Sequence, residues 1–119
     1  MTSYINSTDQ RRQVTDAFRG YAARGEKTNR TEMLNTEVWL SDMAVSQTMS
    51  VLRAEGQERI VAVVKAVYFV DPATPLRKHD IEDRVTAYSA THYVSTASIY
   101  RWLSIARRIY WAILYHEVE

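Results

Sequence analysis

The sequence predicts an all-α protein of about five helices, with a C-terminal helix-turn-helix and a long recognition helix. Apolar residues recur at intervals of three and four along most of the chain, which is the helical period. Chain-breaking residues are scarce, with three glycines and two prolines. The 119 residues, which include no cysteine, suffice for a single domain spanning 1–119 that buries a core without disulfides or metal ions.

The first two predicted helices occupy the N-terminal half. A Ser-x-x-Gln capping box begins at Ser7, and helical spacing then predicts a helix from about Thr8 to Arg24. The polar loop from Gly25 to Arg30 precedes a second helix, which starts at about Thr31 or Thr36 and ends at Glu55, before Gly56. The expected core positions of the two helices are Val14, Phe18, Tyr21, Trp39, Met43, Val45, Met49 and Leu52.

The third segment is ambiguous, because its many β-branched residues also favour a strand. The run from Gln57 to Val70 is too long for a typical strand, which favours a helix. A helix that is apolar on nearly all sides belongs at the centre of the domain. Its inner face is expected to consist of Ile60, Val63, Val64 and Val67.

Two further helices follow a break at Asp71-Pro72. Thr74-Pro75 has the form of a cap followed by proline in a first turn, which predicts a fourth helix ending near Ala90. Thr91-His92-Tyr93 then forms the turn, and a fifth helix runs from Ser95 to about His116. The fifth helix is expected to carry on its inner side Ile99, Trp102, Leu103, Ala106, Ile109, Tyr110 and Ile113.

The helix-turn-helix interpretation rests on spacing within about 74–116. In the general pattern an apolar and a small residue lie before the turn and an apolar-Ser pair after it; Tyr88-Ser89 and Val94-Ser95 occupy these places. Tyr93 stands where many such motifs have glycine, which predicts a wider turn. The anchors that then point into the core are Ile99 and Leu103. Ordinary packing of two helices is the alternative interpretation.

The opposite side of the fifth helix has side chains that are short and polar enough to lie against base edges in a major groove. Arg101 can make a bidentate contact to guanine, whereas the hydroxyls of Ser95, Thr96 and Ser98 either donate to phosphate or cap the helix. The residues of this predicted DNA-binding face are Thr96, Ala97, Tyr100, Arg101 and Arg108.

The charge of the chain sets a limit on this binding. The net charge is +1, which argues against non-specific binding by the whole surface. The fifth helix carries Arg101, Arg107 and Arg108 and has no acid until Glu117, so it can hold phosphates with modest affinity. For Arg107 and Arg108 the alternative is that they are solvated on the outer face or paired with an acid such as Glu117.

The stretch from Tyr88 to Leu103, with Ala106 after it, resembles the helix-turn-helix segment of the lambdoid bacteriophage Q antitermination proteins. That segment itself resembles the part of sigma factors that reads the −35 element. Upstream, Val51-Leu52-Arg53 and the apolar segment from Val63 to Val70 are similar to the helix that precedes the motif in that family.

The resemblance implies a specific function. Such proteins bind double-stranded DNA beside a phage late promoter, join RNA polymerase at a promoter-proximal pause, and travel with it past terminators. It implies base contacts from Thr96, Ala97, Tyr100 and Arg101, and phosphate contacts from Arg108 and Lys78.

Trp111 and Tyr115 continue the outer stripe formed by Ala97, Arg101, Ser104 and Arg108. Two aromatics exposed together would mark a protein contact, either with a second protomer or with RNA polymerase. The alternative is that the first helix covers them.

The sequence offers no catalytic, metal or cofactor site. The three histidines share no metal-ligand spacing with carboxylates, no serine has the context of a triad, and no glycine-rich phosphate loop exists. No signal peptide or membrane span is recognisable, so the expected location is the cytoplasm of a bacterial host. Two hypotheses remain: a DNA-binding phage transcription regulator, and a small helical phage protein that modulates a host protein complex without reading DNA.

Overall fold

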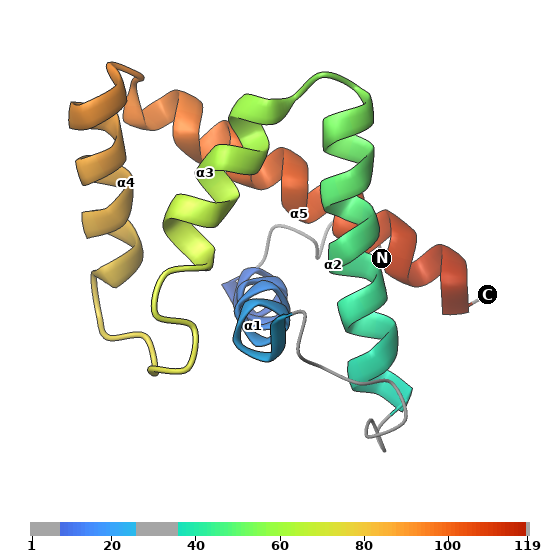
Figure 1. The fold of residues 1–119 in the computed structure, drawn as a ribbon. Coiled ribbons are helices and arrows are strands. Elements are labelled where there is room, and N and C mark those ends of the chain that lie inside the picture. Colours follow the sequence, from blue (N-terminus) through green and yellow to red (C-terminus); the bar gives the residue numbers. More distant parts are fainter. Residues whose placement is uncertain (1–7, 26–35, 119) are drawn as a thin grey trace.

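The computed structural model describes residues 8–25 and 36–118, and these residues form five α-helices and no strand (Figure 1). The prediction of an all-α fold is confirmed. The helices are α1 (Thr8–Arg24), α2 (Thr36–Ala54), α3 (Glu58–Tyr68), α4 (Asp80–His92) and α5 (Thr96–Val118). The predicted capping residue Ser7, the alternative start at Thr31 and most of the predicted polar loop lie outside the described residues.

The long helix α5 is the element that the other helices share. It packs against α1, α2, α3 and α4, and Figure 1 shows it running from the α4 side of the molecule, behind α3, toward α2. In the same view α1 is seen nearly end-on, between α2 and the loop that joins α3 to α4. One side of α5 is therefore buried in the core, and only its opposite side can contact a ligand.

The ambiguous third segment is a helix, α3, and it lies at the centre of the fold. It contacts all four other helices, and within it only Glu58, Arg59, Ala62 and Lys65 are exposed. Burying a branched apolar side chain contributes about 1.5–3 kcal/mol, whereas the weaker helix propensity of valine costs only about 0.5 kcal/mol. Burial therefore decides the conformation. The buried residues of α3 are Ile60, Val61, Val63, Val64, Val67 and Tyr68.

Aromatic contacts join α1 to this centre. The ring of Phe18 is fully buried, and its centroid lies 5.6 Å from that of Tyr68 on α3 and 5.6 Å from that of Tyr110 on α5. Tilted pairs at this distance are favourable beyond the area they bury. The core is completed by Val14, Ala44, Val45, Met49, Leu52, Val85, Ile99, Leu103 and Ala106. Of the predicted core positions, Tyr21 is only partly buried, as are Trp39 and Met43.

The end of α2 was predicted from Gly56. This glycine has a φ of 74°, and the N–H of Gln57 donates to the Leu52 carbonyl at 2.8 Å while that of Gly56 donates to Arg53 at 3.0 Å. This is the Schellman arrangement, which satisfies the last carbonyls of a helix and needs a left-handed residue.

Glycine at position 20, inside α1, leaves room for an ion pair between α1 and α2. A Cβ at this position would lie 2.7 Å from Nη2 of Arg24. The Arg24 guanidinium donates to both carboxylate oxygens of Asp42, each at 2.8 Å. The hydrogen bond to Asp42 raises the pKa of Arg24.

Arg19 on α1 holds the end of α3 and the loop that follows it. Arg19 is only 6% exposed, and burial lowers the pKa of its guanidinium. The carbonyl oxygens at a helix end have no partner within the helix, and a cation is well placed to satisfy them. Arg19 donates to the carbonyl oxygens of Tyr68 at 3.1 Å, Val70 at 2.9 Å, Asp71 at 2.8 Å and Thr74 at 2.6 Å.

This clamp accounts for two wrong boundaries. The third helix was predicted to reach Val70, but it ends at Tyr68 because Arg19 takes the carbonyls there. The fourth helix was predicted to begin at Thr74-Pro75, but α4 begins at Asp80. The carbonyl of Thr74 points to Arg19, and the left-handed backbone of His79, with φ 74°, interrupts any helix that starts earlier. Three acidic residues in the first turn of α4 favour the later start.

The turn between α4 and α5 also differs from the prediction. Helix α4 continues past Ala90 to His92, because the Thr91 hydroxyl donates back to the Ala87 carbonyl at 2.8 Å and fits the helix. The connection therefore consists of three residues, Tyr93 to Ser95. The predicted wider turn is wrong, because Tyr93 itself takes the left-handed conformation, with φ 57° and ψ 42°.

Replacing Arg19 is expected to destabilise the protein strongly. Arg19→Met keeps the apolar stem but removes every donor, and we expect the free energy of unfolding to fall by about 3 kcal/mol. Urea denaturation followed by circular dichroism measures this change. Arg11→Met, at an exposed position of the same helix, is the matched control and should change stability by less than about 0.5 kcal/mol. Equal denaturation midpoints for the two variants would contradict the clamp.

Candidate nucleic-acid interface

The start of α5 is built by serine side chains. The N–H of Ser98 donates to Oγ of Ser95 at 3.1 Å, which is the N-cap hydrogen bond predicted for Ser95. The Ser95 hydroxyl in turn donates to Oγ of Ser98 at 3.0 Å. On the α4 side, the Ser89 hydroxyl donates to the carbonyl of Val94 and so holds the turn. The short connection and the cap together fix the direction in which α5 leaves α4.

Two buried anchors orient the first turns of α5. Ile99 and Leu103 are 0% and 1% exposed, as predicted. Because side chains three and four residues apart share a helix face, burying these two directs the opposite face outward. The predicted face residues that are exposed are Thr96, Ala97, Tyr100, Arg101 and Arg108, while Ser98 is half-buried.

The outer stripe of α5, defined by Ala97, Arg101, Ser104 and Arg108, carries two arginines two turns apart. Seven residues separate them, which corresponds to about 10.5 Å along the helix. The only hydrogen bond of the Arg101 guanidinium within the described chain goes to Oγ of Ser98, at 3.3 Å. Arg108 makes no ion pair with a described side chain. Both guanidinium groups are thus available to an anionic or hydrogen-bonding ligand.

The segment of sequence that contains the outer stripe has no carboxylate that could pair with its arginines. The sequence from Arg84 to His116 contains no Asp or Glu. This segment includes the second half of α4, the turn and almost all of α5. A ligand that carries phosphates would meet no like charge along it.

Tyr100 occupies the edge of the face next to α4. It is 43% exposed, and its pKa is raised first by burial and then by the carboxylate of Glu82 on α4. A nearby carboxylate disfavours a phosphate at this position. The structure therefore groups Thr96, Ala97 and Arg101 on the open face and places Tyr100 at its acidic border.

Lys78 is not brought to the stripe. Lys78 is exposed, but it lies before the first residue of α4, whereas the turn to α5 comes after the last residue of α4. The 13 residues of α4 separate the two ends by about 20 Å. Any phosphate contact of Lys78 would be remote from the start of α5.

Arg107 has a partner that its own helix does not supply. It is half-buried and donates to the Tyr68 hydroxyl on α3 at 2.9 Å, so its guanidinium does not lie on the outer stripe with Arg108. Sequence reasoning also missed Arg59 at the start of α3, whose guanidinium carbon lies 5.4 Å from the centroid of the Trp102 ring. Both contacts join residues about 40 positions apart, which no local pattern predicts.

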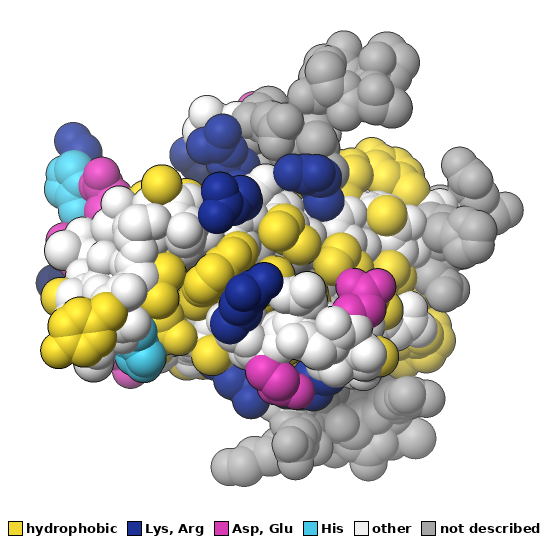
Figure 2. Space-filling model, turned by 90° about the horizontal axis from the view of Figure 1, so that it is seen from above, with side chains coloured by type: hydrophobic (Ala, Val, Ile, Leu, Met, Phe, Trp, Pro, Cys, Tyr) yellow, Lys and Arg dark blue, Asp and Glu magenta, His cyan; other side chains and the backbone are white. Residues whose placement is uncertain are grey.

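The face of the molecule that is uppermost in Figure 1 carries both basic and apolar side chains. In Figure 2 several Lys and Arg side chains (dark blue) lie across the middle of that face, between hydrophobic side chains (yellow). Few acidic side chains (magenta) interrupt them. The basic side chains on this face are suited to an anionic ligand.

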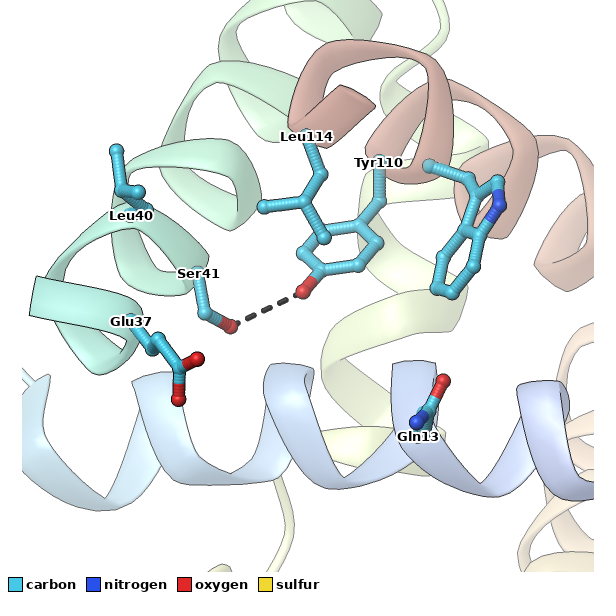
Figure 3. A pocket seen from close by; sticks show the side chains of 7 residues that line it. Gln13, Glu37, Leu40, Ser41, Tyr110 and Leu114 are labelled. Atoms are coloured by element: carbon cyan, nitrogen blue, oxygen red, sulfur yellow. Dashed lines mark hydrogen bonds between the residues drawn. The ribbon is translucent and has the colours of Figure 1, made fainter. Parts of the chain in front are cut away.

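The aromatic pair near the end of α5 is exposed only in part. Tyr115 is 52% exposed, whereas Trp111 is half-buried and packs partly against the core, so the two rings are not exposed together. Their rings meet edge to face, with centroids 5.1 Å apart. Trp111 borders a pocket of about 390 Å³ between α1, α2 and α5, in which the Ser41 and Tyr110 hydroxyls lie 3.0 Å apart (Figure 3). The other lining residues are Gln13, Glu37, Leu40 and Leu114.

The described residues form no metal site and no membrane-spanning helix, and comparison with known proteins gave no match. Within residues 8–25 and 36–118, no cluster of three His, Asp or Glu side chains could hold a metal ion. None of the described helices has the length and apolar content needed to cross a membrane. Comparison with protein-family models, with curated proteins and with solved structures gave no match to the chain.

His79, paired with Glu82 at the start of α4, should lose its proton at a higher pH than an unpaired histidine does. The hydrogen bond to Glu82 raises the pKa of His79 above 6.5, its ordinary value, and the charge of Glu82 adds to this. A raised pKa in the folded state stabilises the protein below the unfolded value, and this contribution is lost as pH rises through the folded value. NMR titration of the His79 ring measures its pKa. Glu82→Gln should lower the midpoint of this titration, whereas the control Glu58→Gln, on α3, should leave it unchanged. An unchanged midpoint in Glu82→Gln would contradict the pairing.

Proposed function

We propose that the protein is a sequence-specific DNA-binding transcription regulator that reads its site with the outer stripe of α5. The observation that carries the proposal is that Arg101 and Arg108 lie exposed on a capped helix, in a segment of the sequence from Arg84 to His116 that contains no Asp or Glu. The three-residue connection from α4 and the buried anchors of α5 are also features of helices that enter the major groove.

The side chains of the stripe have chemistry suited to base edges. An arginine guanidinium donates two parallel hydrogen bonds to O6 and N7 of guanine, and Arg101 is exposed in the second turn of α5. Thr96 and Ala97, one turn earlier, are small, so the helix can approach the groove closely, and their methyl groups can contact a thymine methyl. Arg108 lies further along the helix, where it can reach a phosphate.

The charge balance implies that this helix does not bind DNA tightly on its own. The protein has a net charge of +1, and each phosphate contact changes the logarithmic salt slope by only about 0.9. Two arginines on one helix supply only a small part of the 6–10 phosphate contacts that strong salt-dependent binders make. A partner, either RNA polymerase or a second protomer, would supply the remaining contacts.

Dependence on a partner fits an antiterminator of the Q type, which the segment from Tyr88 to Leu103 resembles. Such a protein must hold DNA and RNA polymerase together. On α5, Tyr115 is 14 residues beyond Arg101, about 21 Å along the helix. The pocket beside Trp111 and the exposed Tyr115 therefore form a second surface that a protein can occupy while the start of the helix lies on DNA.

The two arginines of the stripe should have different effects on binding. Arg101→Ala removes a base contact, so we expect about a tenfold loss of affinity for the cognate duplex and relaxed preference at one base pair. Arg108→Ala removes a phosphate contact, so binding should weaken on all sequences and the salt slope should decrease by about 1.

Fluorescence anisotropy measures these effects with duplexes selected by the wild-type protein from a random-sequence pool. Arg53→Ala, at an exposed position near the end of α2, is a control of equal charge change. Base reading through α5 would be excluded if Arg101→Ala bound the selected duplex with wild-type affinity and preference.

Antitermination is tested by transcription in vitro. On a template with a late promoter, a promoter-proximal pause and a downstream terminator, the protein should increase the fraction of transcripts that pass the terminator. Arg101→Ala should lose this effect because loading begins at the DNA site. Absence of read-through with the wild-type protein, together with specific DNA binding, would exclude the antiterminator role and leave a regulator of another kind.

The second candidate function is a small helical phage protein that modulates a host protein complex without reading DNA. It is favoured by the pocket between α1, α2 and α5, whose mainly apolar lining adjoins the exposed ring of Tyr115. Aromatic side chains beside a pocket are typical anchors of protein interfaces. This function would be preferred if the wild-type protein enriched no duplex from the pool.

A further inference from the structure

Tyr93 is the most exposed aromatic residue in the described part of the chain. Its side chain lies at the tip of the turn between α4 and α5 and is 94% exposed, against 43% for Tyr100 and 52% for Tyr115. The backbone of Tyr93 is left-handed, with φ 57° and ψ 42°. A bulky residue rarely adopts this conformation.

Neither packing nor backbone preference accounts for a tyrosine here. Its ring buries almost no surface, so it contributes nothing to the core. At this position, just after a helix, glycine adopts the left-handed conformation without the steric cost that a Cβ imposes. Strained residues with no structural benefit are found at functional sites, where a ligand uses the side chain.

The position of Tyr93 relates it to the outer stripe of α5. It precedes the N-cap residue Ser95 by two positions, so its ring is next to the end of the helix that carries Thr96, Ala97 and Arg101. It also lies within the acid-free segment from Arg84 to His116. An anionic backbone that borders a groove occupied by α5 could approach this ring without meeting a carboxylate from that segment.

We infer that Tyr93 binds the sugar–phosphate backbone of DNA at the edge of the groove that α5 enters, an inference that rests on the proposed function. In an intact duplex the faces of the bases are stacked and closed to a side chain outside the groove. Sugars and phosphates are what a residue on the turn would meet, and tyrosine is among the side chains that bind phosphate oxygens. The ring packs against a deoxyribose, and the hydroxyl donates to a phosphate oxygen.

This contact has properties that distinguish it from the contacts of the two arginines. It carries no sequence information, unlike a base contact of Arg101. It involves no cation, so it releases no counterion and does not change the salt slope, unlike a phosphate contact of Arg108. It also opposes stability, because the best residue for the fold at position 93 is glycine.

The test compares Tyr93→Gly and Tyr93→Phe with the wild-type protein and with Val70→Ala, which shortens another exposed apolar side chain away from the turn. Anisotropy at low salt measures affinity for the selected duplex and for a duplex of scrambled sequence, and thermal denaturation measures stability. We expect Tyr93→Gly to bind both duplexes about tenfold more weakly and to melt about 4 °C higher. Tyr93→Phe, which loses only the hydroxyl, should bind both about threefold more weakly. Val70→Ala should bind as the wild type does.

Three outcomes would overturn the inference. Wild-type affinity in Tyr93→Gly would show that the ring touches no DNA, while the proposed function would stand if Arg101→Ala still lost binding. A loss restricted to the selected duplex would show a base contact in place of a backbone contact. Failure of the wild-type protein to bind any duplex would exclude the proposed function and this contact together.

Discussion

The position of α4, and through it the entry into α5, depends on the buried guanidinium of Arg19. A helix end followed by an irregular loop leaves several carbonyl oxygens without partners, and burying them unpaired would cost about 1–3 kcal/mol each. Arg19 reaches four of them, from Tyr68 to Thr74, with a planar group that has five donors. The loop is thereby fixed against α1, and α4 starts at Asp80 from a defined point.

Helix α5 combines two functions on opposite sides. Its inner side is buried among the other four helices and fixes its rotation about its own axis. Its outer side carries no side chain that the core needs, so arginines at positions 101 and 108 can remain exposed. The same rigidity that the core requires is what a helix needs to present side chains to a groove in one register. A short, serine-capped connection to α4 extends this rigidity to the first turn.

Much of the fold followed from local patterns, and the errors share one cause. The helix at Thr8–Arg24, the glycine end of α2, the serine cap and the two anchors of α5 each depend on residues within one or two turns, which spacing reveals. The boundaries of α3 and α4 depend on Arg19, about 50 residues away, so the cap-like Thr74-Pro75 was misleading. In the candidate site, Ala97, Arg101 and Arg108 are exposed where the helical period places them, while Ser104 is half-buried. The covering of Trp111, the acidic border at Tyr100 and the partner of Arg107 depend on other helices, which local spacing does not reveal.

The sequence by itself determined that the chain is helical, where most helices lie, and which side of the last helix has polar, basic and small residues. These properties follow from a period of 3.6 and from side chains that interact with near neighbours. Only the tertiary structure decided which of those residues are free for a ligand and how the turn before α5 is made. Exposure depends on which distant helix covers a residue, and the left-handed backbone of Tyr93 depends on where α4 and α5 must meet.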